Sequence, residues 1–212
     1  MNKRNHPQMD AGDEQRRDAP PTIYLDAQGQ YLAEQGHPDP PDAGDEIATL
    51  LGFLERQRAT FAWKCAGLDA AGVRATVGAS AMTLGGMLKH LARFEDDMSA
   101  EWLHGHAQRP PWNRVDWNAD PIWDWRLATD DTPEQLYALW QDAVARSRSL
   151  LTEALADGGP ERRGRGITDA RGALPSLRYI LINMIEEYAR HNGHADLIRE
   201  SVDGLVGNDP PG

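Results

Sequence analysis

Three residues that can bind a metal ion lie close together near the C-terminal end of the chain, namely Glu187, His191 and His194. The spacing steps by four and then by three residues, and in an α-helix both steps place side chains on the same face in consecutive turns. Carboxylate oxygen and imidazole nitrogen are common protein ligands of zinc and of related divalent ions. The spacing therefore predicts a helical metal-binding face. One helix cannot enclose an ion, so a further protein ligand has to come from another part of the chain.

The helix expected to carry these residues extends over 177–200 and has a continuous apolar side. A step of 100° per residue gathers its apolar residues in one arc: Leu177, Met184, Tyr188, Ala195 and Ile198. The three candidate ligands fall at the edge of that arc. Ionisable groups that converge beside a core are costly unless they are paired or bind a cation. The simpler interpretation, that each is a hydrogen-bonded residue at the core boundary, stays open at this point.

His90 is the candidate among the seven histidines for a ligand from a second helix. It lies in a predicted helix over 82–104, at the border of the apolar side. That side is formed by Leu84, Met87, Leu88, Leu91, Met98 and Trp102. Asp97 and Glu101 follow on the same side as His90. Each either orients a ligand histidine through its second ring nitrogen or is an ordinary solvated charge, which is the interpretation that we favour.

The remaining histidines and the single cysteine are weaker candidates. His6 and His37 belong to a polar N-terminal segment, and we expect His104 and His106, which flank a glycine at a helix end, to be exposed to solvent. Cys65 is expected to be a small buried apolar residue rather than a reactive thiol. One cysteine allows neither an intrachain disulfide framework nor a thiolate zinc cluster, and this pattern favours a reducing cytoplasm.

The positions of the candidate ligands depend on a bundle of helices. Apolar periodicity predicts four long helices, over 46–66, 82–104, 132–156 and 177–200. Asp45 is expected to cap the first helix, Thr132 begins a capping-box sequence before the third, and Ser176 precedes the fourth. We therefore predict an all-α fold, a four-helix bundle with long crossover loops, because such bundles place metal sites between facing helices.

The 212 residues are expected to form one domain with extensions at both ends. The bundle should occupy residues 45–206. Residues 1–44 are rich in Pro, Asp, Gln and Gly and are predicted to be an irregular N-terminal extension, in which only 22–32 favours a short strand or hairpin. Residues 207–212 form a C-terminal tail.

Four tryptophans are crowded into the polar segment 105–131, and their apolar rings need burial. They are Trp112, Trp117, Trp123 and Trp125. They either form a satellite cluster that holds the loop down, which we favour, or wall the mouth of a pocket. A second polar loop carries Arg162, Arg163 and Arg165, which either meet an anionic ligand or face solvent.

Composition excludes several classes of function. The formal net charge is −11, so phosphate-rich nucleic acids and anionic membranes would repel the chain. The N-terminal sequence lacks the apolar segment of a signal peptide, and we find no uninterrupted apolar run of the roughly 18 residues that a membrane span needs. We expect no nucleic-acid partner, no membrane partner and no export.

Three phrases of the sequence resemble the DinB-like superfamily, specifically an actinobacterial branch related to mycothiol-dependent enzymes such as maleylpyruvate isomerase. They are TLLGFLERQRATFAWKCAGLD, SAMTLGGMLKHLARFEDD and LRYILINMIEEYARHNGHADLIRES. The similarity covers about residues 40–206. It implies a bundle, often dimeric, that binds a divalent metal through His90, Glu187 and His191. His194 is considered either a further ligand or a partner of a ligand histidine. Asn183 stands where relatives often have a histidine.

The resemblance and the ligand types together suggest a metal-dependent thiol transferase or isomerase. Zinc is the expected ion, with nickel, iron or manganese also compatible. The metal would stabilise the thiolate of a low-molecular-weight thiol similar to mycothiol, and the thiolate would attack a small electrophile. Two alternatives stay open: a metal-dependent hydrolase, and a non-enzymatic, stress-related protein whose metal is structural. A homodimer is expected from the resemblance alone.

Overall fold

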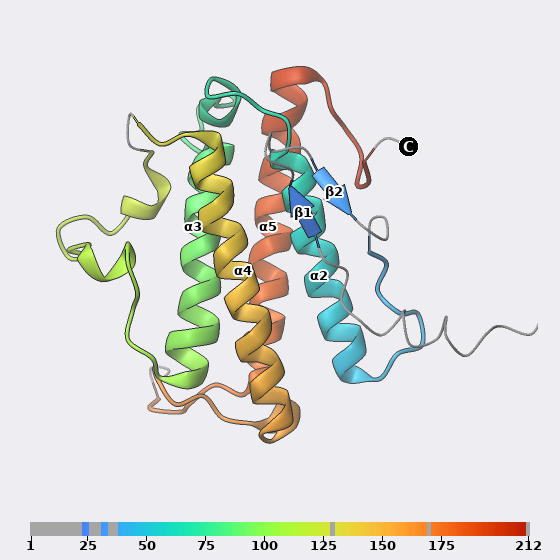
Figure 1. The fold of residues 1–212 in the computed structure, drawn as a ribbon, viewed down its shortest axis with the longest axis vertical. Coiled ribbons are helices and arrows are strands. Elements are labelled where there is room, and N and C mark those ends of the chain that lie inside the picture. Colours follow the sequence, from blue (N-terminus) through green and yellow to red (C-terminus); the bar gives the residue numbers. More distant parts are fainter. Residues whose placement is uncertain (1–22, 26–30, 34–37, 128–129, 169–170, 211–212) are drawn as a thin grey trace, which may run out of the picture.

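The computed structural model describes residues 23–25, 31–33, 38–127, 130–168 and 171–210. Four long helices form a bundle, as predicted, and the all-α fold class is confirmed (Figure 1). They are α2 (Glu46–Cys65), α3 (Leu84–Asp96), α4 (Pro133–Ala156) and α5 (Leu177–Asp203). The most extensive packing is between α2 and α5 and between α3 and α4. The bundle therefore consists of two helix pairs, and α3 and α5, which carry the candidate ligands, belong to different pairs.

Each predicted N-cap side chain accepts a hydrogen bond from the first turn of its helix. Asp45 Oδ1 accepts from the amide of Ala48 at 2.8 Å, and Ser176 Oγ accepts from the amide of Tyr179 at 3.2 Å. Thr132 and Gln135 form the complete capping box at the start of α4. These bonds satisfy amide donors that have no partner within the helix, so the starting residues of three helices were predictable from the sequence.

The helix predicted over 82–104 is present from Leu84 to His104, but much of its second half is not α-helical. α3 ends at Asp96, and a π-helical segment, η2 (Asp97–Trp102), follows it. Ser99 Oγ donates to the carbonyl of Glu95 at 2.6 Å and thereby competes for a carbonyl that an α-helical amide would otherwise use. A π-helical turn of this kind changes the direction in which the following side chains point.

A hydrogen-bonded ionic network lies inside the apolar core and joins all four helices. Arg58 of α2 donates to both carboxylate oxygens of Glu95 of α3, at 2.8 and 2.6 Å. The hydroxyl of Tyr188 of α5 donates to Glu95 at 2.7 Å and accepts from the indole of Trp140 of α4 at 2.8 Å. Arg58, Glu95 and Tyr188 are at most 1 % exposed, so this network fixes the helices at the centre of the bundle.

The described part of the N-terminal extension contains a short antiparallel pair of strands, β1 (Ile23–Leu25) and β2 (Tyr31–Ala33). The sequence indicated a strand or hairpin in this region. His6 and His37 lie outside the described residues. Among the described helices, none is long and apolar enough to cross a membrane.

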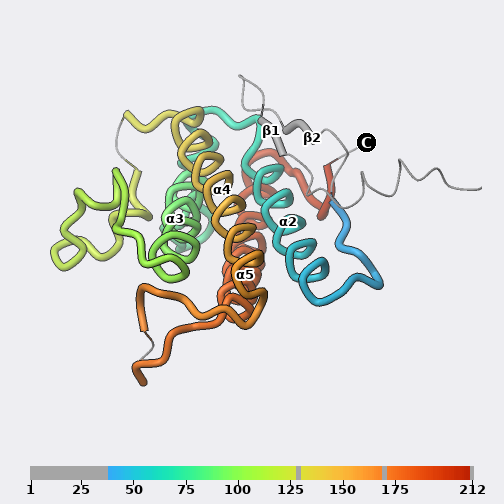
Figure 2. The backbone as a smooth tube through the Cα atoms, turned by 60° about the horizontal axis from the view of Figure 1, so that its bottom comes forward, coloured from blue at the N-terminus to red at the C-terminus, as the bar shows by residue number. Residues whose placement is uncertain are grey.

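Two long connections lie outside the four helices, and one of them reaches the candidate ligands. Residues 104–127 project beyond α3, and residues 157–168 and 171–176, between α4 and α5, lie at one end of the bundle (Figure 2). At the end of the π-helical segment, the side chain of His104 is only 4 % exposed and its Nε2 lies 3.0 Å from the carbonyl of Leu150, so its predicted solvent exposure is wrong. His106 is exposed, and Cys65 is fully buried as predicted.

Candidate metal centre

The structure brings His90, Glu187 and His191 together between α3 and α5. The ligand atoms of the three side chains all lie within 4.8 Å of one another. Nε2 of His90 and Nε2 of His191 each lie 3.1 Å from the same carboxylate oxygen, Oε1 of Glu187. Two residues come from neighbouring turns of α5 and the third from the facing helix. The prediction that the third member comes from the second helix agrees with this arrangement.

The second nitrogen of each imidazole is also engaged. Nδ1 of His90 lies 2.9 Å from Oδ2 of Asp124, and Nδ1 of His191 lies 3.3 Å from Nδ1 of His194. An Nδ1–H that donates outward leaves the Nε2 lone pair directed at the shared point beside Glu187. Partners of this kind fix the tautomer and the orientation of a metal-binding histidine.

The arrangement of atoms fits a divalent cation. In a tetrahedral site with bonds of about 2.1 Å, neighbouring ligand atoms are separated by about 3.4 Å. The two Nε2–Oε1 distances of 3.1 Å are close to that separation. Neutral Nε2 atoms and an ionised carboxylate oxygen are all acceptors, so they repel one another unless a proton or a cation lies between them. Two histidines and one glutamate also leave a coordination position free, as in catalytic metal sites.

The pKa values of the cluster show how strongly these acceptors compete for a positive charge. Hydrogen bonds from His191 and then His90 hold the pKa of Glu187 well below its ordinary value. Burial opposes protonation of His90, but its hydrogen bonds to Asp124 and Glu187 outweigh burial and raise its pKa. Burial lowers the pKa of His194, with a further contribution from the neighbouring His191. Protonation is therefore favoured at His90 and disfavoured at Glu187 and His194, and a metal bound by His90 has to displace its proton.

Asp124 comes from the tryptophan-rich segment that packs on α3. Its side chain is 2 % exposed, and its contact with His90 lowers the pKa of the carboxyl although burial alone would raise it. Besides His90, two residues of α3 hold the segment in place. The ammonium group of Lys89 donates to the carbonyl of Arg126 at 2.8 Å, and Arg93 lies 3.4 Å from Asp124. The loop therefore supplies a buried carboxylate behind a candidate ligand.

The four tryptophans divide between the two roles considered for them. The rings of Trp112 and Trp117 both pack edge-on against Trp123, which forms the satellite cluster that holds the segment down. Trp125 instead stacks on His90 with ring centroids 4.1 Å apart. It lines a hollow of about 370 Å³ above the cluster, together with Met82, Glu187, Arg190, His191 and His194. Both interpretations hold, each for different tryptophans.

Three other residues singled out in the sequence are not part of the converging group. Asp97 accepts from Arg93 at 3.1 Å, and Glu101 accepts from Gln108 at 3.2 Å. Neither carboxylate is hydrogen-bonded to a candidate ligand among the described contacts. His194 lies behind His191 and outside the group of three whose ligand atoms converge.

The arginines of the second polar loop contact protein groups. Arg162 and Arg165 both contact Asp157, at 3.3 and 3.0 Å. Arg163 donates to the carbonyl of Leu174 at 3.2 Å. Arg162 is buried, whereas Arg163 and Arg165 are exposed. Of the two alternatives for this cluster, contact with solvent therefore describes only the last two arginines.

The buried carboxylate of Asp124 was missed because it is far from the ligands in sequence. It stands in the segment WDW, between Trp123 and Trp125, and an acidic residue flanked by tryptophans in a long loop is a weak signal. Burial of both neighbours would carry the carboxylate towards the protein interior, where it needs a partner. That reasoning indicates a buried acid, but the sequence does not say which histidine it meets.

Comparison with known proteins identifies a family. A family model described as mycothiol-S-transferase matches residues 49–204. The matched region contains α3, α4 and α5 in full, nearly all of α2, and the three clustered residues. The chain matches no curated protein and no solved structure.

Proposed function

The chain belongs to the mycothiol-S-transferase family, and we propose that it is a metal-dependent enzyme that transfers a low-molecular-weight thiol such as mycothiol to a small electrophile. The observation that carries the proposal is the convergence of Nε2 of His90 and Nε2 of His191 on Oε1 of Glu187, each at 3.1 Å. When each Nδ1 carries the proton and donates to its outer partner, the two Nε2 lone pairs and the carboxylate oxygen face one another, and a cation or a proton between them would stabilise this arrangement.

Three side chains would hold the metal and two would orient them. His90, Glu187 and His191 would supply the ligand atoms, with Zn²⁺ as the expected ion for this donor set. Asp124 would hold His90 in the tautomer that presents Nε2, and His194 would do the same for His191. A divalent cation at this point supplies a strong positive charge that favours a thiolate over a thiol at neutral pH.

The proposed reaction is an S-transfer in which the thiol is the nucleophile. The S–H bond is broken and the sulfur lone pair attacks the electrophilic carbon. A new S–C bond forms while the bond from that carbon to the leaving group breaks. The leaving group departs with the bonding pair and ends with the proton that the thiol lost, so the products are a thioether and the protonated leaving group.

The hollow of about 370 Å³ above the cluster is the proposed site of the electrophile. Trp125 offers an apolar ring on one side, and Met82 adds an apolar, adaptable side chain. Arg190 is 61 % exposed and brings a positive charge to the rim. A small apolar electrophile with an acidic group would complement these three side chains.

We also propose that two copies associate through the outer side of α5. Tyr179, Ile182 and Leu197 are 53, 50 and 58 % exposed, and all three lie on one stripe of the helix. A line of exposed apolar side chains is typical of a protein interface. Light scattering after size-exclusion chromatography should give twice the mass of one chain. A single charged replacement, Ile182→Glu, should reduce the measured mass to that of one chain.

Thiol-dependent turnover tests the proposed function. We expect the metal-loaded protein to conjugate mycothiol with a halogenated nitrobenzene, and we expect Glu187→Gln to reduce kcat/KM by at least about 100-fold, since one ligand charge is lost. The matched control is Glu186→Gln, because Glu186 is the preceding residue on the same helix and its side chain is 66 % exposed. Full turnover in Glu187→Gln, with only a lower Tm, would assign the cluster a structural role.

A further inference from the structure

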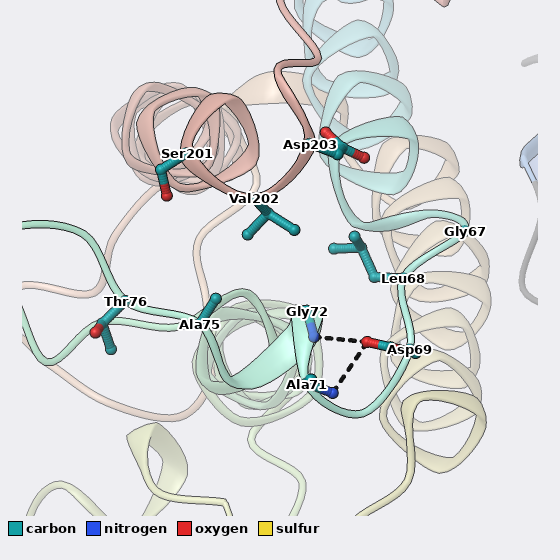
Figure 3. A pocket seen from close by; sticks show the side chains of 10 residues that line it. All are labelled: Gly67, Leu68, Asp69, Ala71, Gly72, Ala75, Thr76, Ser201, Val202 and Asp203. Carbon is teal, nitrogen blue, oxygen red and sulfur yellow. Dashed lines mark hydrogen bonds between the residues drawn. The ribbon is translucent and has the colours of Figure 1, made fainter.

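A second hollow lies at the C-terminal end of α5, next to the loop that follows α2. It has a volume of about 600 Å³. Figure 3 shows α5 on one side and the loop on the other, with Leu68 and Val202 between them. Ser201 and Asp203 approach from α5, and Asp69 and Thr76 approach from the loop.

The two hollows lie along the same side of α5. His194 lines the hollow above the metal cluster, and Ser201 lines the second one. Seven residues are close to two full turns, so both side chains point in nearly the same direction, separated by about 10 Å along the helix axis. The loop follows the same course, since Thr76 lines the second hollow and Met82 the first.

The lining of the second hollow has a definite chemistry. Asp69 Oδ1 accepts from the amides of Ala71 and Gly72, at 3.0 and 2.8 Å, which fixes the carboxylate and leaves Oδ2 as an acceptor. Asp203 is paired with Arg199 at 2.8 Å, so its charge is offset. Hydroxyl groups come from Thr76 and Ser201. Within the described chain, no lysine, arginine or histidine lines this hollow.

We propose that this hollow binds the uncharged, polyhydroxylated part of the thiol cosubstrate while its sulfur is at the metal cluster. This inference rests on the proposed function. Mycothiol carries its cysteinyl group on two sugar-like rings, and about ten bonds between the sulfur and the far ring span roughly 12 Å. Ser201 lies ten residues beyond the candidate ligand His191, about 15 Å along the helix axis, so the extended thiol reaches the near edge of the second hollow with the outer hydroxyls of its far ring. Carboxylate and hydroxyl groups bind hydroxyls, and Leu68 and Val202 complement the C–H faces of the rings.

The same lining selects against anionic thiols. A thiol such as glutathione carries carboxylates, and these would meet the carboxylate of Asp69 with no cationic side chain of the lining to bind them. The hollow thus determines which thiol the enzyme accepts, whereas the metal cluster determines what happens to the sulfur.

Affinity measurements with matched thiols test the inference. We would load the full chain with Co²⁺ and follow its absorption on titration with mycothiol and with N-acetylcysteine amide, which has the same thiol end without the rings. Ser201→Trp and Thr76→Trp fill the hollow from opposite walls. Each variant should lower the affinity for mycothiol by at least about 10-fold and should change the affinity for N-acetylcysteine amide by no more than about 2-fold. The control is Ala145→Trp, a change at an exposed residue of α4 that lines neither hollow.

The carboxylate of Asp69 is tested by a separate variant. Asp69→Asn keeps the oxygen that accepts from the two loop amides and removes the negative charge. It should reduce the preference for mycothiol over glutathione by at least about 3-fold. Equal affinity of the wild type for mycothiol and the fragment, or unchanged mycothiol affinity in both tryptophan variants, would overturn the inference and leave the proposed function intact. If the cobalt-loaded wild type binds no thiol at all, the proposed function is overturned and the inference with it.

Discussion

Two groups of ionisable side chains, one buried and one partly buried, lie side by side in this bundle and differ in how their charges are balanced. In the core network, Arg58 contacts both Glu55 and Glu95, and Arg148 donates to both oxygens of Glu55. Two arginines thus balance two glutamates. In the metal cluster, by contrast, acceptor atoms face one another. Matched buried charges hold the helices in one arrangement, whereas acceptors that need a proton or a cation between them mark a candidate site for a cation.

Neighbouring residues of α5 belong to the two different groups. The carboxylate of Glu187 faces His90 and His191, and the hydroxyl of the next residue, Tyr188, donates to Glu95 inside the core. α3 is divided in the same way, since His90 faces the cluster and Glu95 faces the network. The network therefore holds the two helices that carry the ligands at a fixed rotation and separation.

The largest expected effect comes from unbalancing the core network. Glu95→Ala leaves the guanidinium of Arg58 buried without its main partner, and such a change costs about 3–5 kcal/mol of the free energy of unfolding. Urea denaturation at pH 7 measures the loss. A loss below about 1 kcal/mol would contradict a structural role for the network. The double variant Arg58→Met with Glu95→Leu should lose much less, because no buried charge remains.

Removal of the metal should have the next largest effect on stability, and only in a protein whose cluster is intact. An ion present at about 100 times its Kd stabilises the folded state by about 2.7 kcal/mol. Prolonged treatment with a chelator should therefore lower the Tm of the wild type by several degrees. His90→Ala is the control, and its Tm should not respond to the chelator. An equal response in both proteins would contradict the assignment of the cluster.

A smaller effect is expected from the carboxylate behind His90. Asp124→Asn can still accept a hydrogen bond but removes the charge, and loss of such an outer partner weakens metal binding by about 10–100-fold. Competition with a chromogenic chelator measures the Kd. An unchanged metal affinity would show that Asp124 only anchors the tryptophan-rich loop.

The comparison also shows what could be read from the sequence. The spacing of Glu187 and His191 predicted one face of the site, because residues four apart in a helix are neighbours. Helix ends were predictable from Asp45, Thr132 and Ser176, because caps are local interactions. The position of Asp124 was not predictable from the sequence. Its loop is held on α3 by contacts of Lys89 and Arg93, and the residues that these two contact lie far from them in the sequence.

The core network was missed for a related reason. Arg58 and Glu95 lie 37 residues apart, and each alone reads as a surface charge on an amphipathic helix. Only the packing of four helices shows that both are buried and paired. The π-helical segment after Asp96 was also not predicted. Apolar periodicity does not show that the side chain of Ser99 bonds to a backbone carbonyl of the preceding turn.

The smallest effect concerns the negative charge of Asp97, which follows α3. Burial, with smaller contributions from Glu101 and Asp124, raises the pKa of Asp97 to about 6 in the folded protein. The folded state therefore binds a proton more tightly than the unfolded chain, and this contribution to stability is present below about pH 4 and is lost as the pH rises through 6. Asp97→Asn should stabilise the protein at pH 7 by up to about 1 kcal/mol, less than the full shift because the contact with Arg93 weakens. Urea denaturation at pH 7 and pH 4 should show the gain only at pH 7, and an equal gain at both would contradict the assignment.

The most direct test of the cluster is elemental analysis of the purified protein, prepared without a histidine tag, beside His191→Ala. The account predicts about one equivalent of a divalent metal per chain in the wild type and a large loss in the variant, because one of three ligands is gone. His106→Ala is the matched control, since His106 is exposed and outside the cluster, and it should retain the metal. A wild type that holds no metal after reconstitution with Zn²⁺, or a variant that holds as much as the wild type, would contradict the account.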